Sequence, residues 1–123
     1  MRCMANELSL SISATQTKNG VTYAKNFSGL LITVTGDTPV SQIASIGTSD
    51  ETLSLGDISS LGYIVLKNLD ATNYIEVGYV SGTYFGKLKA GETCALRAGA
   101  GLTAIHVKAN TAPCLLDSLI FPN

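Results

Sequence analysis

The chain has no tryptophan, a single histidine and three cysteines, and it is poor in charge. Charged residues make up 14% of its 123 residues, against roughly 25% in an average domain. The shortage excludes long solvated helices, which carry many Glu and Lys side chains. Ser, Thr and Gly take the place of the missing charge, and these residues suit strand surfaces and tight turns.

Other absences exclude whole classes of partner and location. The net charge is -1 and the Lys and Arg residues are scattered, so no basic stripe marks a nucleic-acid or anionic membrane surface. No apolar run has the length of a signal peptide or a bilayer span, and we expect a protein made in the cytoplasm.

Three cysteines cannot form a disulfide framework, and Cys94 and Cys114 are interpreted as small buried hydrophobes in strands.

The sparse charge also predicts association, because small proteins with few surface charges tend to stick together. We therefore expect part of the outer surface to be covered by copies of the chain or by a partner.

Alternating apolar and polar residues recur along the whole chain. In ELSLSIS, Leu8, Leu10 and Ile12 face one way and the serines between them face the other, which is the pattern of a half-buried strand. Asn19-Gly20 then predicts a tight hairpin turn. GYIVLKNLD is more continuously apolar, which indicates a central strand covered on both sides. In KLKAGETCALRAG, Ala90-Gly91 is expected to close another hairpin.

About ten or eleven strand candidates follow one another at intervals of roughly 8 to 12 residues. This spacing predicts an all-β, single-domain antiparallel β-sandwich, jelly-roll-like, or a partly closed barrel. The domain is expected to span residues 1–123, with residues 1–6 as a flexible N-terminal segment.

Motifs that could carry chemistry are weak. Gly99, Gly101 and Ala104 have the spacing of a dinucleotide fingerprint, but a strand-like segment follows them, so they are interpreted as a turn. His106 with Cys94 and Cys114 lacks the close ligand pairs of a zinc site. His106 is expected on an exposed strand face, and Asp50-Glu51 in a turn or at the start of a strand. The sequence thus predicts no enzyme, no metal and no cofactor.

Tyrosines cluster in NYIEVGYVSGTYFG, where Tyr74, Tyr79 and Tyr84 lie close together. One hypothesis is an aromatic platform for a glycan. The favoured interpretation is that they lie at the edge of the core or in a subunit interface, where tyrosine is enriched.

Four segments carry a resemblance to a known family: GTSDETLSLGDI, LGYIVLKNLDATNYIEVG, KLKAGETCALRAG and VKANTAPCLLDSLIF. They resemble small proteins encoded among the structural genes of tailed bacteriophages, in which a stretch like NLDATNYIEVG precedes an LKAGE turn and an ANTA segment. The resemblance covers roughly Ser45 to Phe121, and the N-terminal strands more loosely. It brings no catalytic residues with it.

The resemblance implies a structural component of a virion, made in the cytoplasm of a bacterial host. The expected role is a capsid decoration (cement) protein that forms homo-oligomers and binds the major capsid protein. A tail or head-to-tail connector component and a receptor- or carbohydrate-binding module are the alternatives. Neither direct nucleic-acid binding nor membrane binding is expected.

Two groups of residues are candidates for the interfaces. Aromatic side chains in a glycine-rich region are available for contact, and an exposed strand edge can accept a strand from a neighbouring chain. The candidates are Tyr79, Tyr84 and Phe85 in the first group and Ser9, Ser11 and Ser13 in the second.

Overall fold

The computed structural model describes residues 8–32, 39–99 and 101–123. The chain divides between residues 35 and 36 into two compact units. The first holds a β-hairpin and the second a β-sandwich, and each is described by itself.

The hairpin consists of β1 (Leu8–Lys18) and β2 (Val21–Ile32), paired antiparallel. Asn19 and Gly20 join the strands with φ angles of 52° and 76°. Two successive positive φ values define the type I′ turn, whose twist matches that of paired strands. The hairpin turn predicted from Asn-Gly is confirmed.

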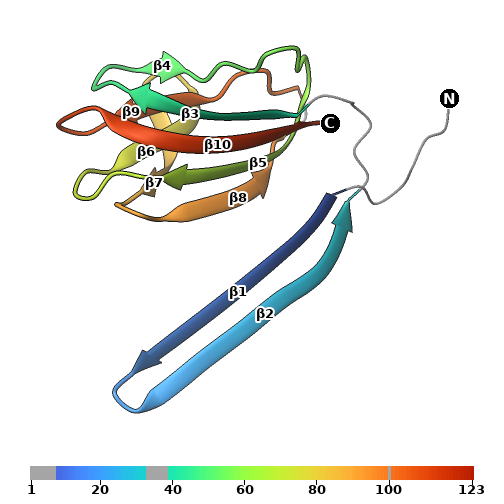
Figure 1. Ribbon diagram of the computed structural model, residues 1–123, viewed down its shortest axis with the longest axis vertical. Coiled ribbons are helices and arrows are strands. Elements are labelled where there is room, and N and C mark those ends of the chain that lie inside the picture. The colour runs from blue at the N-terminus through green and yellow to red at the C-terminus, as the bar shows by residue number, and fades with distance from the viewer. Residues whose placement is uncertain (1–7, 33–38, 100) are drawn as a thin grey trace, which may run out of the picture. The chain divides into compact units, whose positions relative to one another are not determined.

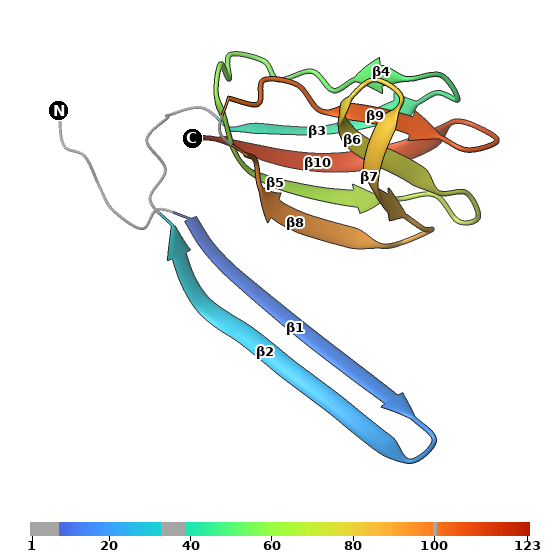
Figure 2. The same ribbon diagram turned by 180° about the vertical axis from the view of Figure 1, so that it is seen from behind.

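The sandwich consists of two four-stranded antiparallel sheets (Figures 1 and 2). The first sheet has the order β3-β10-β5-β8 and the second the order β4-β9-β6-β7. The strands of the first sheet are β3 (Val40–Ile46), β10 (Cys114–Pro122), β5 (Leu61–Asn68) and β8 (Thr93–Arg97). Those of the second are β4 (Glu51–Thr52), β9 (His106–Ala109), β6 (Ile75–Val80) and β7 (Thr83–Leu88). β6 and β7 pass behind β10 in Figure 1 and in front of it in Figure 2.

The core lies between the two sheets and is almost purely aliphatic. β5 and β10 run through the middle of the first sheet, and every second residue of each is buried. Ile64, Leu66 and Ile120 from this sheet meet Ile75 and Val107 from the second. The all-β prediction is confirmed, and among the described residues no sheet closes into a barrel.

The N-terminal strands pair only with each other among the described residues, and they belong to the first of the two units. One expectation from the sequence needs correction. The turn at Ala90-Gly91 exists, with the Glu92 amide donating to the Lys89 carbonyl oxygen at 3.0 Å. It joins β7 to β8, which belong to different sheets, and therefore closes no hairpin. The segment 1–6 lies outside the described residues.

The motifs that carry the family resemblance meet around one buried side chain, Asn68. Its Nδ2 donates to the carbonyl oxygens of Asn73 at 2.8 Å and Leu88 at 3.0 Å. Its backbone pairs with the LKAGE turn, because the Asn68 amide donates to the Glu92 carbonyl oxygen and the Gly91 amide donates to that of Asn68. Asn68 thus fastens the end of β5 to the connection between the sheets.

The rest of NLDATN is held by side-chain oxygens. Asp70 accepts the backbone amides of Thr72 and Asn73, and these bonds, with that of Asn73 the stronger, hold the pKa of its carboxyl below the ordinary value. The ANTA segment completes the network, since Asn110 Oδ1 accepts the Tyr74 amide at 2.9 Å and Thr111 donates to Asn73 Oδ1. The three segments NLDATN, LKAGE and ANTA therefore have a structural role in this chain.

Asn68→Ala is expected to lower the free energy of unfolding by about 2–4 kcal/mol, because it leaves two carbonyl oxygens and the Asp70 amide without their partner. Urea unfolding measures the change. Asn26→Ala, at an exposed hairpin position, is the control and should change stability by less than about 0.5 kcal/mol. Equal effects of the two substitutions would contradict a central role for Asn68.

Candidate interaction surfaces

The hairpin has one apolar and one polar face. Cross-strand partners share a face, so the pairs Ile12–Phe27, Gln16–Tyr23 and Lys18–Val21 lie on one side. We call Ile12, Ala14, Val21, Tyr23 and Phe27 the hairpin apolar face. Thr and Ser dominate the other side, where the Thr17 and Thr22 hydroxyls are 3.0 Å apart.

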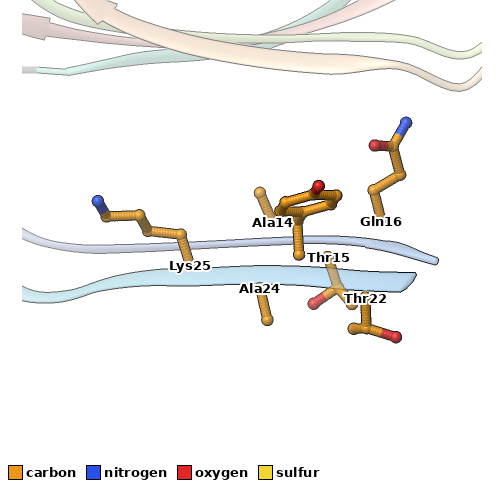
Figure 3. Close-up of a pocket in the computed structure, with 7 residues that line it drawn as sticks. Ala14, Thr15, Gln16, Thr22, Ala24 and Lys25 are labelled. Atoms are coloured by element: carbon orange, nitrogen blue, oxygen red, sulfur yellow. The ribbon is translucent and has the colours of Figure 1, made fainter. Parts of the chain in front are cut away.

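Figure 3 shows this division directly. Ala14, Gln16 and Lys25 project to one side of the two strands, and Thr15, Thr22 and Ala24 to the other. Together with Tyr23 these residues line a pocket. Because they project from opposite faces of a two-stranded sheet, the pocket is an open surface and not a cavity that encloses a small molecule.

The hairpin apolar face is exposed to an unusual degree. The exposed fraction is 70% for Tyr23, 56% for Phe27 and 43% for Ile12. A two-stranded hairpin is marginally stable in water, and a stable sheet needs more strands or a layer packed on its apolar side. This face has the character of a contact surface.

The outer face of the first sheet carries apolar side chains among charged ones. Alternation directs the residues that flank the buried positions outward, and the cross-strand register places them in neighbouring rows. The apolar members of this first-sheet outer face are Ile43, Tyr63, Val65, Ala95, Leu115 and Leu119. Lys67, Thr93, Arg97 and Asp117 lie among them. Ile43 is 61% and Leu115 51% exposed. An antiparallel sheet that borders water normally turns a polar face outward.

The second sheet has that ordinary polar outer face. Glu76 is in register with Lys87 on one side and with Lys108 on the other. The Lys87 ammonium lies 4.8 Å from the centre of the Tyr74 ring. Val80 and Phe85 of the same sheet are 62% and 56% exposed, so both sheets also carry exposed apolar side chains.

A polar network joins three residues at the second sheet. Asp50, just before β4, accepts a hydrogen bond from the Tyr84 hydroxyl at 2.5 Å through Oδ1. Its Oδ2 lies 2.8 Å from Nδ1 of His106. The hydrogen bond from Tyr84, followed by that from His106, lowers the pKa of the Asp50 carboxyl. The bond to Asp50 in turn raises the pKa of the Tyr84 hydroxyl.

An Asp–His pair of this kind orients the imidazole ring. Nucleophilic catalysis would further need a Ser, Thr or Cys bonded to Nε2. No such bond is found among the described residues. The network is best understood as a clamp that connects β4 and β9 with β7.

The aromatic candidates divide between two environments. Tyr79 packs against the core, and its ring stacks on that of Phe85 with centroids 5.1 Å apart. Burial raises the pKa of the Tyr79 hydroxyl. Phe85 is 56% exposed, whereas the hydroxyl of Tyr84 is engaged by Asp50. Of the three, Phe85 alone presents its ring openly.

The serine candidates Ser9, Ser11 and Ser13 are exposed positions of β1. β1 pairs only with β2 among the described strands, so its other edge is open. The serine candidates belong to the first unit, and Tyr79, Tyr84 and Phe85 belong to the second.

The remaining candidates behave as ordinary parts of the fold. Cys114 is buried and Cys94 packs against the core, and burial raises the pKa of both thiols. Among the described residues no three His, Cys, Asp or Glu side chains cluster as metal ligands. Gly99, Gly101 and Ala104 precede strand β9, as expected for a turn.

Sequence reasoning missed both the Asp50 network and the apolar outer face of the first sheet. Asp50 was considered with its neighbour Glu51, and His106 with the cysteines, whereas the true partners are separated by 34 and 56 positions. The outer face had a visible signal, namely the continuous apolar run in GYIVLKNLD.

No family model matches the chain, and neither the search of curated proteins nor that of solved structures found a similar one. Among the described residues no helix is long and apolar enough to cross a membrane.

The Asp50 network predicts a specific pH dependence. Because the folded-state pKa of Asp50 is lowered, its contribution to stability is complete above the unfolded-state value of about 3.9 and is lost as the pH falls through the folded-state value. Asp50→Asn is therefore expected to destabilise the protein at pH 7 and to have a smaller effect at pH 3. Urea unfolding at the two pH values measures this. An equal loss at both would contradict a charged carboxylate as the centre of the network.

Proposed function

We propose that the chain is a non-enzymatic structural component of a tailed bacteriophage virion. Its role is that of a capsid decoration protein, which binds the outer shell in many copies and stabilises contacts between major capsid subunits. The observation that supports this most is the long hairpin, whose apolar face is exposed in a chain with few charges. An arm of this kind suits a protein whose work is to hold neighbours together.

The resemblance of NLDATNYIEVG, LKAGE and ANTA to phage structural proteins supports the same role. In this chain the three motifs form the hydrogen-bond network around Asn68. The resemblance therefore points to a similar sandwich in those phage proteins. A sandwich with an aliphatic core fits a particle component, which needs stability and complementary surfaces.

Binding to several neighbours at once would let such a protein stabilise a shell. A protein that binds only the assembled shell shifts the equilibrium toward that shell, and many modest contacts add up across a lattice. Each contact can be weak, provided that each copy touches more than one neighbour. A chain with two separate apolar surfaces meets this condition.

A tail or head-to-tail connector component is the second candidate, because a ring of copies would use the same two surfaces. The carbohydrate-binding hypothesis has less support. Tyr84 is turned toward Asp50 and Tyr79 toward the core, so the tyrosines do not form one aromatic platform.

The copy number of the chain, measured by quantitative mass spectrometry of purified particles of the phage that encodes it, tests the proposal. We expect a ratio to the major capsid protein near one, or a simple fraction of it. A handful of copies per particle would favour the connector, and complete absence from particles would refute a virion role.

A second measurement tests the predicted contact residues. If Tyr84 and Phe85 bind the shell, the Tyr84→Ala and Phe85→Ala proteins will be incorporated less than the parent chain. Ser11→Pro will reduce incorporation if the open edge of β1 is a contact. Asp57→Ala, at an exposed turn position outside both surfaces, is the control. Normal incorporation of each variant would remove the corresponding residue from the interface.

A further inference from the structure

We propose that Asn19, at the tip of the hairpin, is a site of spontaneous deamidation, and that its isoaspartyl product unpairs the hairpin. Asn19 is the only asparagine of the chain that a glycine follows, and the sequence contains no Asp-Gly pair. The inference goes beyond the proposed function and does not rest on it, because it concerns a reaction of the chain by itself.

The reaction needs only the chain and water. The backbone nitrogen of Gly20 attacks Cγ of the Asn19 side chain, so that a new C–N bond forms and the Cγ–Nδ2 bond breaks. The side-chain nitrogen leaves as ammonia and takes the Gly20 amide proton with it, and a five-membered succinimide ring remains. Water then opens the ring. Attack at Cγ gives aspartate, whereas attack at the backbone carbonyl carbon gives isoaspartate, in which the main chain runs through Cβ and Cγ.

The surroundings of the hairpin tip leave this attack unhindered. Asn19 and Gly20 are both exposed, and a Cβ built on Gly20 would meet no atom of the described residues within 4 Å. Glycine also has no side chain beside the reacting nitrogen. Asn68 and Asn73 differ from Asn19, because their side chains are held by hydrogen bonds and the larger residues Leu and Tyr follow them.

The paired turn protects Asn19, so the reaction proceeds when the hairpin opens. The φ angle of Asn19 is 52°, which lies in the left-handed region, where ψ is about +30° to +60°. At such ψ values the Gly20 nitrogen points away from the Asn19 side chain, and ring closure requires a rotation about the Cα–C bond that breaks the turn. A two-stranded hairpin is marginally stable in water, so open conformations are populated and can react.

The two products differ in their effect on the hairpin. Asp-Gly forms the same type I′ turn as Asn-Gly, so aspartate preserves the loop. Isoaspartate adds one backbone atom to a two-residue loop, and the loop length and turn type fix the register of a hairpin. The register that begins at the pair Lys18–Val21 and ends at Leu8–Ile32 then loses the turn that sets it.

Peptide mass spectrometry of the purified full-length chain, after incubation at mildly alkaline pH, tests the reaction. Asn19 is expected to deamidate at least about tenfold faster than Asn26, which requires only about 1.4 kcal/mol less activation free energy. Asn26 is the matched control, because it is exposed in the same hairpin but precedes Phe27. Equal rates at the two residues, or no reaction at Asn19, would overturn the proposal.

The same measurement in concentrated urea tests whether the hairpin must open. Asn19 of the unfolded chain is expected to react at least about fivefold faster than Asn19 of the native chain, because opening the turn costs at least about 1 kcal/mol. A native rate as high as the unfolded rate would show that the turn gives no protection, and would contradict this step.

Hydrogen–deuterium exchange tests the effect on the hairpin. The isoaspartyl form, separated by chromatography, is expected to exchange the amides of residues 12–18 and 21–27 faster than the Asn19→Asp variant, which should resemble the parent chain. The two proteins have the same composition and charge and differ only in the path of the main chain at position 19, so Asn19→Asp is the matched control. Equal exchange in the two would overturn the claim that isoaspartate unpairs the hairpin. None of these measurements bears on whether the chain occurs in particles, so the proposed function can fail or survive separately.

Discussion

An apolar face of a β-sheet has to be covered by a second layer, and the organisation of this protein follows from that constraint. In the sandwich, the inner faces of the two sheets cover each other through aliphatic side chains such as Ile64 and Ile75. The hairpin apolar face and the first-sheet outer face have no such cover within their own units. A chain with so few charges cannot solvate them as an ordinary polar surface would, so association is the expected way to bury them.

One polar side chain, that of Asn68, organises part of the otherwise apolar interior. Asn68 is fully buried, and its amide holds the ends of β5 and β7 to the loop at Asn73. Asn110 and Thr111 join the same loop from the segment before β10. Three motifs that are far apart in sequence therefore form one structural unit. In this chain the three motifs encode turns and the hydrogen bonds that hold them.

Local patterns predicted the local structure well. The alternation of Leu8, Leu10 and Ile12 predicted a strand, and Asn19-Gly20 predicted the type I′ turn, because both signals depend on neighbours in sequence. The assignment of strands to sheets could not be derived in the same way. The turn at Ala90-Gly91 is compatible with a hairpin or with a crossing between sheets, and the pairing of β7 with β6 and of β8 with β5 decides between them.

The candidate sites also divide into features that local patterns predict and features that depend on residues far apart in the sequence. Exposure of Phe85 and burial of Cys114 follow from composition and alternation, whereas the Asp50 network depends on the register between β4, β9 and β7. The pairing of the N-terminal strands only with each other among the described residues could not be predicted, because a hairpin strand and a sandwich strand share one alternating pattern. An alternating pattern shows which residues share a face of a strand, but it does not show which other layer covers that face.

The central claim, that the exposed apolar face of the hairpin is buried by association, is tested most directly by hydrogen–deuterium exchange at several protein concentrations. The account predicts that the amides of residues 12–18 and 21–27 exchange more slowly as the concentration rises, while those of β5 and β10 stay slow throughout. Hairpin amides whose exchange rate is the same at every concentration would contradict it.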